Sequence, residues 1–384
     1  MTVRTPVDLD HLATTPLDPR VLEVMLPVLR DHHGNPASPH ASGWAAAALV
    51  ERAREHVAAC AGAEPSEIIF TSGATESINL ALKGLADMSS GPGHIVTTVL
   101  EHSSVLRTIE SLADRGWDIT SVPCDRDGII DPAEVAAALK PDTRLVSLNA
   151  VQNEIGTVQP WRDIASVCQE RGVPLHLDAA QAVGKIPLHA TDDGLALMSF
   201  SSHKMYGPKG AGALFVRRRD PRMTLRRQID GGGQERGLRS GTLNVAGIVG
   251  MGEACRLAME EREQRADHLR NLADQFLAAI TAGVPDVSLN GCARRRLPGS
   301  LHCLFPGVRA DRLIRALPKL SLSAGAACGS GDPAPSAVLL AIGLDAEDAR
   351  SCLRICLGKD TTPEDVTYAA GSLVDAVRSL QVNW

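Results

Sequence analysis

Short apolar runs alternate with amphipathic stretches through the first two-thirds of the chain. The runs have the length of buried strands, and the stretches between them repeat apolar positions roughly every three or four residues, as helices do. Strands joined by helices need crossover connections, so the pattern predicts an α/β fold with a mostly parallel sheet covered on both faces. The expected strands cover residues 68–70, 95–99, 145–151, 173–177, 195–200 and 213–216, and the expected helices cover residues 76–84, 103–114 and 161–171.

The pattern changes near residue 251. A charged helical stretch is expected from Met251 to Ile280, followed by short strands between residues 297 and 305 and by helices that begin near Asp311 and Ser336. The change predicts two domains. We expect a large domain over residues 16–255 and a smaller α+β domain formed by residues 1–15 and 256–384.

Composition narrows the classes of function. The chain has 384 residues, 44% hydrophobic and 22% charged, with a net charge of -6. Its basic runs at residues 217–219 and 294–296 are short, so we expect no direct nucleic-acid binding. No apolar run approaches the roughly 20 residues that span a bilayer, and residues 1–8 lack the apolar core of a signal peptide. We therefore expect neither membrane insertion nor secretion.

The nine cysteines are scattered and include no Cys-x-x-Cys pair. This pattern argues against a disulfide framework or a zinc site and favours a reducing cytoplasm. Eight of the nine are expected to be unreactive core residues.

Candidate chemistry follows from the strand ends. In a mostly parallel sheet, ligands bind at the carboxyl ends of the strands. The loops expected to carry a site begin at Thr71, Leu100, Gln152, Asp178 and Ser201.

Asp178 and Lys204 together indicate one cofactor. Asp178 closes an apolar strand, where an unpaired carboxylate is costly and needs a cationic partner such as a protonated pyridine nitrogen. Lys204 follows in the segment 201–210, where a desolvated lysine near that carboxylate would form a Schiff base. Pyridoxal 5'-phosphate (PLP) offers both groups. Taken alone, a lysine in a glycine- and proline-flanked turn is an ordinary solvated loop residue.

Three further positions fit the same cofactor. Residues 71–77 join a predicted strand to a predicted helix, and a phosphate would bind at that helix N-terminus. An ordinary N-cap formed by Ser72 or Thr75 would explain the same residues. Gln181 would donate a hydrogen bond to the phenolic oxygen of the ring, and His102 would stack on the ring, although a strand-end histidine is commonly structural.

The segments that carry a family resemblance are residues 34–38, 71–79, 101–102, 153–156, 178–181, 199–212 and 231–242. In order and spacing, they resemble the cysteine desulfurases of the class V aminotransferase family. Each motif alone is modest, whereas their ordered occurrence is specific and spans nearly the whole chain. The resemblance implies the PLP-dependent transferase fold of type I, with PLP as cofactor and a homodimer as the assembly.

The resemblance also implies a role for each matched residue. Lys204 would carry the cofactor, and Asp178 and Gln181 would bind its ring, while His102 would stack on the ring and take part in catalysis. Thr242 would reach the phosphate in the neighbouring subunit. The remaining cofactor residues would be Ala74, Thr75, Ser201 and His203, and the substrate residues would be Asn35, Asn153 and Arg354, whose guanidinium suits a carboxylate.

Cys328 separates a desulfurase from other PLP enzymes. It lies in the small-residue segment 323–336, which is expected to expose its thiol. The resemblance implies that L-cysteine becomes L-alanine while Cys328 captures the sulfur as a persulfide and passes it to an acceptor or scaffold protein. The alternatives are an aminotransferase or lyase acting on another amino acid, and a catalytically silent binding scaffold.

The segment after Cys328 has the longer form found in the first group of these desulfurases. That group serves iron-sulfur scaffolds, nitrogenase assembly, tRNA thiolation or DNA phosphorothioation. Several residues depart from the family pattern, which leaves the acceptor open between DNA phosphorothioation and a general iron-sulfur role. The departures are Gln152, Ala324, Ala326, Gly329, Arg350, Lys359 and the cysteines Cys352 and Cys356, which are expected to pack in the core.

Overall fold

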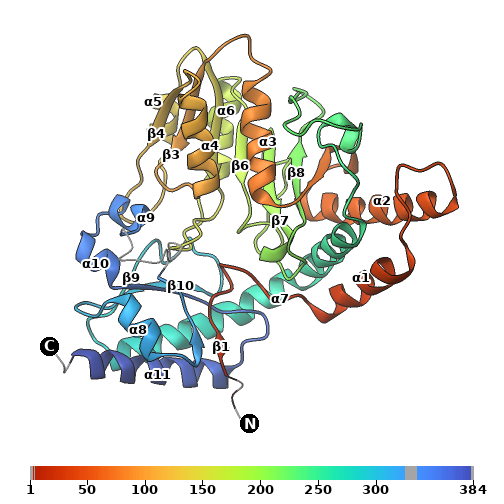
Figure 1. The fold of residues 1–384 in the computed structure, drawn as a ribbon. Coiled ribbons are helices and arrows are strands. Elements are labelled where there is room, and N and C mark those ends of the chain that lie inside the picture. The colour runs from red at the N-terminus through yellow and green to blue at the C-terminus, as the bar shows by residue number, and fades with distance from the viewer. Residues whose placement is uncertain (1–2, 4, 325–334, 382–384) are drawn as a thin grey trace.

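The computed structural model describes residues 3, 5–324 and 335–381. Within them, the main feature is a seven-stranded sheet with the strand order β2-β8-β7-β6-β5-β3-β4 (Figure 1). Strands β4, β3, β5, β6 and β7 are parallel, and β8 runs antiparallel to both of its neighbours. The predicted α/β class and mostly parallel sheet are therefore confirmed. The strands are β2 (Ile68–Thr71), β3 (His94–Thr98), β4 (Asp118–Val122), β5 (Thr143–Asn149), β6 (Leu175–Asp178), β7 (Leu197–Ser201) and β8 (Gly212–Val216).

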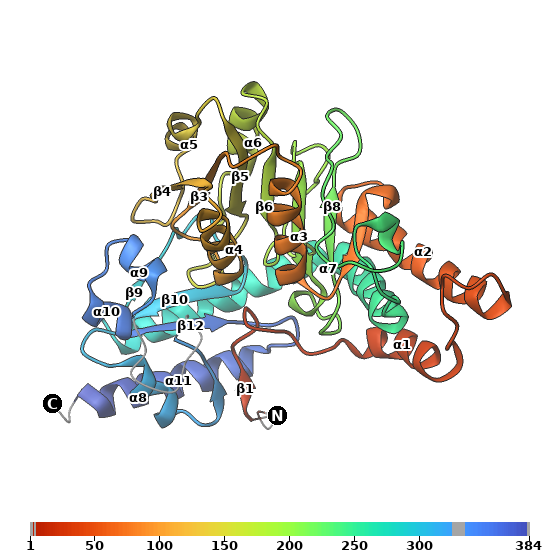
Figure 2. The same ribbon diagram turned by 45° about the horizontal axis from the view of Figure 1, so that its top comes forward.

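Helices cover both faces of this sheet, as Figures 1 and 2 show. Alternate residues of a strand point to opposite faces, so Ile68 and Phe70 of β2 join one core and Ile69 joins another. Burial on both faces explains why the strands read as continuous apolar runs. One face packs against α3 (Ala74–Ala86) and α4 (Ser103–Ala113), and the other packs against α2 (Ala41–Ala61), α5 (Pro132–Ala138), α6 (Trp161–Glu170) and α7 (Val245–Gly283).

A separate hydrophobic core lies beside this layered unit. Strand β1 (Val7–Asp8) pairs with β11 (Leu320–Ser321), which places the N-terminal segment with the C-terminal part of the chain. The predicted two-domain division stays a prediction, and the separate cores support it. The other elements of this region are β9 (Ser288–Leu289), β10 (Ser300–Leu304), β12 (Cys352–Cys356), α8 (Ala310–Ala316) and α11 (Pro363–Gln381). The short helices α9 (Ala337–Ala341) and α10 (Ala346–Arg350) pack on the core of the large sheet instead.

Helix α7 connects the two cores. It has 39 residues and begins where the Asn244 side chain accepts a hydrogen bond from the Gly247 backbone N–H at 3.1 Å. Its first part, around Met251, belongs to the core under the large sheet, and its last part, around Phe276, belongs to the second core. The expected helix over residues 251–280 is confirmed and extended, and the predicted boundary at residue 255 lies inside it.

Several elements were not among those expected from the sequence, including α1 (Pro19–Asp31), β4, α5, β12 and α11. Strand β4 lies at the sheet edge and exposes much of its length, so it carries no continuous apolar signal. Helix α1 packs on α7 through a narrow face that includes Val21. No helix within the described ranges combines the length and the apolar character that crossing a membrane requires.

A buried ion pair fixes the glycine-rich loop 231–242 against the large sheet. Arg54 on α2 donates to the two carboxylate oxygens of Glu235 at 2.9 and 2.8 Å, and the Phe70 backbone N–H donates to the same carboxylate at 2.7 Å. Both charged side chains are at most 4% exposed. Arg54 also contacts Glu51, which is 59% exposed. Removing Glu235 would leave the buried Arg54 with the solvated Glu51 as its one ion-pair partner among the described residues.

We predict that Glu235→Ala lowers the free energy of unfolding by about 3–5 kcal/mol, because it leaves the buried Arg54 guanidinium without its buried counter-ion. Glu51→Ala is the matched control, and it should cost less than about 1 kcal/mol because the Glu51 carboxylate is solvated. Chemical denaturation of both variants measures the difference. Equal losses in the two variants would contradict the assignment.

Candidate active site

A pocket of about 960 Å³ opens at the carboxyl ends of the parallel strands. Its walls come from the loops after β2, β3, β5, β6 and β7, from residues 10–14 and from β12. The loops expected to carry a site therefore do meet in one place. The predicted residues that line it are Ala74, Thr75, His102, Asn153, Asp178, Gln181, Ser201, His203, Lys204 and Arg354.

Three predicted residues are not among this lining. Asn35 lines a different hollow, next to Arg54 and Glu235, so a single chain does not bring it to the pocket. Thr242 is exposed in the glycine-rich loop, where a residue expected to serve a neighbouring subunit would lie. Cys328 lies outside the described residues. The roles of all three stay predictions.

Asp178 is the buried anion of the pocket. It ends β6 between Asn149 of β5 and Ser199 of β7, and it is 6% exposed. One carboxylate oxygen accepts a hydrogen bond from the Ala180 backbone N–H at 3.0 Å. Burial raises the pKa of Asp178, while that hydrogen bond and the charges of His102 and Lys204 act against this rise. Within the described residues it forms no ion pair, so the fold leaves it needing a cation.

Glu101, beside His102, is a pocket residue to which sequence reasoning assigned no role. It is 4% exposed, and one of its oxygens accepts hydrogen bonds from Thr98 at 2.6 Å and from the Asn149 backbone at 3.0 Å. Its other oxygen has no partner within the described part of the chain. Burial, reinforced by Asp178, raises the pKa of Glu101 to about 8. The sequence signal that could have identified Glu101 is an acidic residue shortly after the buried strand β3.

Lys204 presents its amine from a short turn after β7, residues 202–204. The amine donates hydrogen bonds to the backbone carbonyls of Leu12 at 2.8 Å and Ala13 at 2.7 Å. Burial and the positive charge of Arg354 lower the pKa of Lys204 to about 8, against the opposing effect of Asp178. A substantial fraction of this amine is therefore neutral, and so nucleophilic, near physiological pH.

The start of α3 lacks the side-chain cap that was the alternative to a phosphate site. Neither Ser72 nor Thr75 caps the helix, because Gly73 takes that position without a side-chain bond. The Glu76 carboxylate instead accepts a hydrogen bond from the Ser72 N–H at 2.8 Å and pairs with Arg239 of the glycine-rich loop at 2.9 Å. The helix N-terminus thus faces the pocket without a capping side chain, as an anion site requires.

His102 caps α4 with its ring. Its Nδ1 accepts a hydrogen bond from the Ser104 backbone N–H at 3.1 Å, which assigns the proton of the neutral ring to Nε2. The ring lines the pocket on the same side as Glu101. Its predicted stacking on a cofactor ring stays a prediction.

Arg354 brings the small sheet to the pocket. Its guanidinium donates to the Asn153 carbonyl at 3.0 Å and to Asp10 at 2.7 Å, and the residue is 5% exposed. Its Nε atom is buried and has no acceptor within the described residues. A buried guanidinium with a free donor is suited to a carboxylate.

Of the eight cysteines that the structure describes, seven are buried and Cys124 is half-buried. Cys352 and Cys356 pack in the core as expected, and burial raises the pKa values of their thiols to about 12 and about 11. Among the residues that the structure describes, no three metal-binding side chains are grouped to hold an ion.

The pocket fits PLP in charge and in chemical groups. Asp178 lacks a cation and would face the protonated ring nitrogen, the open N-terminus of α3 would face the phosphate, and Lys204 supplies the amine. Gln181 donates from Nε2 to the Leu12 carbonyl at 2.8 Å and still has a second N–H for the phenolic oxygen. Fold and site together define a fold-type I PLP enzyme.

Comparisons with known proteins place the chain in one family. Residues 7–368 match the class V aminotransferases. Cysteine desulfurase of Mus musculus is 48% identical over 381 residues, which cover 99% of this chain and 83% of the mouse protein. Cysteine desulfurase IscS of Neisseria meningitidis serogroup C is 48% identical over 389 residues, which cover 100% of this chain and 96% of that relative. The chain belongs to the class V aminotransferase family and, within it, to the cysteine desulfurases.

Solved structures agree with this assignment. A NifS-like protein superposes with a TM-score of 0.90 at 37% identity, over 96% of this chain and 98% of that chain. SspA, solved in complex with cysteine, gives 0.80 at 36% identity over 93% and 100% of the two chains. DndA from Streptomyces lividans gives 0.78 at 39% identity over 90% and 97%. The family and fold expected from the sequence are confirmed.

We predict opposite effects of Asp178→Asn on folding and on cofactor binding. Without PLP, the variant should gain about 1–3 kcal/mol of unfolding free energy, because a buried unpaired carboxylate is removed. Its affinity for PLP should fall at least about tenfold, because the ring nitrogen loses its partner. Urea unfolding and PLP titration measure the two quantities. The exposed Asp192→Asn is the control, and losses in both quantities for Asp178→Asn would contradict the prediction.

We also predict how the reaction with PLP depends on pH. The rate at which the cofactor-free protein reacts with PLP should rise with pH and reach half its maximum near pH 8, where the Lys204 amine loses its proton. Arg354→Gln removes a neighbouring cation, so it should raise the pKa of Lys204 and move the midpoint to higher pH. The exposed Arg312→Gln should leave the midpoint in place, and Lys204→Ala should give no reaction. Stopped-flow absorbance follows the reaction, and a midpoint unmoved by Arg354→Gln contradicts the electrostatic assignment.

Proposed function

We propose that this protein is a PLP-dependent cysteine desulfurase that converts L-cysteine to L-alanine and a persulfide on Cys328, and that an acceptor then takes the sulfur. One observation carries the proposal. The pocket that joins Lys204 and Asp178 is closed on one side by Arg354 and Ser323, so the chain leading to Cys328 starts at the pocket itself.

Arg354 and Asn153 would orient the substrate. The guanidinium is held by the Asn153 carbonyl and by Asp10, which fixes its plane and leaves Nε for a carboxylate oxygen. A carboxylate bound there would direct the amino group and the Cα hydrogen toward Lys204. Two parallel donors give a guanidinium more orientational control than an ammonium would.

Lys204 would move the proton. When bound, PLP withdraws electrons from the substrate Cα and makes the carbon-sulfur bond breakable. The Lys204 amine, with its pKa lowered to about 8, would take the Cα proton, and the carbonyls of Leu12 and Ala13 would accept its N–H bonds once it is charged. Asp178 remains the fixed negative charge for the ring nitrogen.

Cys328 would take the sulfur. Its thiolate attacks the substrate sulfur, an S–S bond forms, and the C–S bond breaks with its electron pair left on the substrate carbon, which a proton then converts to the methyl group of alanine. The described chain stays near the pocket on both sides of this segment. The Arg354 backbone N–H donates to the Ser323 carbonyl at 2.8 Å, and Ser336 donates to Glu154 at 2.7 Å. Cys328 is the fifth residue after Ser323 in the sequence, a distance of at most about 18 Å along the chain.

The homodimer and the cytoplasmic location are part of the same proposal. Exposed apolar side chains on α1 and α2, Leu22, Leu26, Leu29 and Trp44, are 41–65% exposed and support a contact with a second subunit. Unpaired cysteines throughout the described chain support a reducing compartment.

The sulfur acceptor stays a prediction. A general iron-sulfur role is supported by the 48% identity to a relative named IscS, and DNA phosphorothioation by the 39% identity to the structure named DndA. Capture of persulfide acceptors with Cys328 intact and with Cys328→Ser would separate them. The aminotransferase alternative is not favoured, because the relatives matched over nearly the whole chain are desulfurases.

We predict that Cys328→Ser lowers alanine and sulfide formation from L-cysteine, with a reductant present, by about 100-fold or more, because the attacking thiolate is lost. Cofactor absorbance should be retained. Cys124→Ser, a half-buried cysteine away from the pocket, is the control and should keep full turnover. Unchanged turnover in Cys328→Ser would reject the persulfide route.

A further inference from the structure

Lys185 is a charged residue behind the pocket to which the proposed mechanism gives no task. It stands four residues after Gln181 in a helical turn that follows β6, so the two side chains share one face of the turn. The Lys185 amine donates a hydrogen bond to Gln181 Oε1 at 2.8 Å. This contact connects Lys185 to a residue expected at the cofactor ring.

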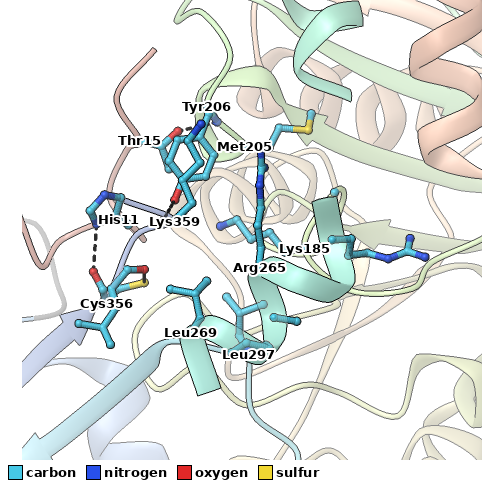
Figure 3. A pocket seen from close by; sticks show the side chains of 15 residues that line it. His11, Thr15, Lys185, Met205, Tyr206, Arg265, Leu269, Leu297, Cys356 and Lys359 are labelled. Atoms are coloured by element: carbon cyan, nitrogen blue, oxygen red, sulfur yellow. Dashed lines mark hydrogen bonds between the residues drawn. The ribbon is translucent and has the colours of Figure 1, made fainter. Parts of the chain in front are cut away.

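The surroundings of Lys185 do not explain it as an ion-pair residue. Figure 3 shows it among His11, Arg265 and Lys359 around a small cavity of about 50 Å³. Within the described part of the chain, no carboxylate lies within ion-pair distance of its amine. Burial, with smaller contributions from the charges of Lys204 and Arg354, lowers its pKa to about 8, and the Cys356 thiol acts in the opposite direction.

The backbone next to Lys185 passes close to α7. Gly184 has a φ of 75°, and a Cβ atom there would lie 2.9 Å from Ala258 Cβ of α7. A glycine is therefore needed for the turn to pass this close to α7.

Gln181 is held at both ends of its amide. Oε1 accepts from Lys185, and Nε2 donates to the Leu12 carbonyl at 2.8 Å, which also accepts from the Lys204 amine at the same distance. An amide without such contacts rotates freely between two orientations that exchange its donor and its acceptor. Lys185 can only donate and the Leu12 carbonyl can only accept, so both contacts require Oε1 on the Lys185 side and leave the second N–H of Nε2 for the pocket.

We propose that Lys185 is a positioning residue that fixes the amide orientation of Gln181, so that Gln181 donates a hydrogen bond to the phenolic oxygen of PLP. The inference rests on the proposed function, because it assumes PLP in the pocket. That hydrogen bond stabilises the phenolate. It therefore lowers the pKa of the proton shared between the phenolic oxygen and the Lys204 nitrogen.

The test is a pH titration of the visible absorption band of the PLP-loaded protein. Lys185→Met should raise the pKa of the band by about one unit, and it should weaken PLP binding by about tenfold, as expected for the loss of one hydrogen bond to a charged group. Lys185→Arg keeps a donor and a charge, and it should retain most of the wild-type value. If methionine prevents folding, Lys185→Ala replaces it.

A double-mutant cycle separates positioning from simple charge removal. If Lys185 acts through Gln181, Lys185→Met should shift the band no further in a Gln181→Leu background. An equal shift in both backgrounds would overturn the proposal, because it would show direct electrostatics. No shift in the wild-type background would also overturn it. Absence of any PLP band in the wild-type protein would instead reject the proposed function.

Discussion

The site depends on one buried carboxylate that the protein does not neutralise. Asp178 ends the central strand of a sheet covered on both faces, and no cation within the described residues pairs with it. The neighbouring Glu101 has its pKa raised to about 8, so it is mostly neutral at physiological pH and adds little negative charge. A single anion buried in this way favours a cationic ligand, and the cost of burying it is offset when that ligand binds.

Both ends of the chain complete the pocket. Residues 10–14 supply the carbonyls that receive Lys204 and Gln181 and the carboxylate that holds Arg354. Arg354 in turn binds the backbone at Ser323 and at Asn153. Arg354, Lys204 and the chain at Ser323 are therefore all held by hydrogen bonds to neighbouring parts of the pocket wall.

The sequence was sufficient for the features that depend on strand order. Apolar runs predicted the buried strands, and their carboxyl ends predicted where Asp178 and Lys204 meet. Features that depend on contacts between distant segments were not predictable. Strand β4 lies at the edge and has no continuous apolar run. The contact of Glu76 with Arg239 joins residues that are distant in the sequence, and the contact of Leu12 with Gln181 forms only when the N-terminal segment is packed.

Helix α7 limits how the two cores can move. It runs without a break through both of them and, at 39 residues, is roughly 58 Å long. A flexible linker would let the cores rotate as separate bodies, whereas a continuous helix acts as a stiff rod that transmits any tilt from one end to the other. A hinge-like rotation of one core against the other would therefore require this helix to bend.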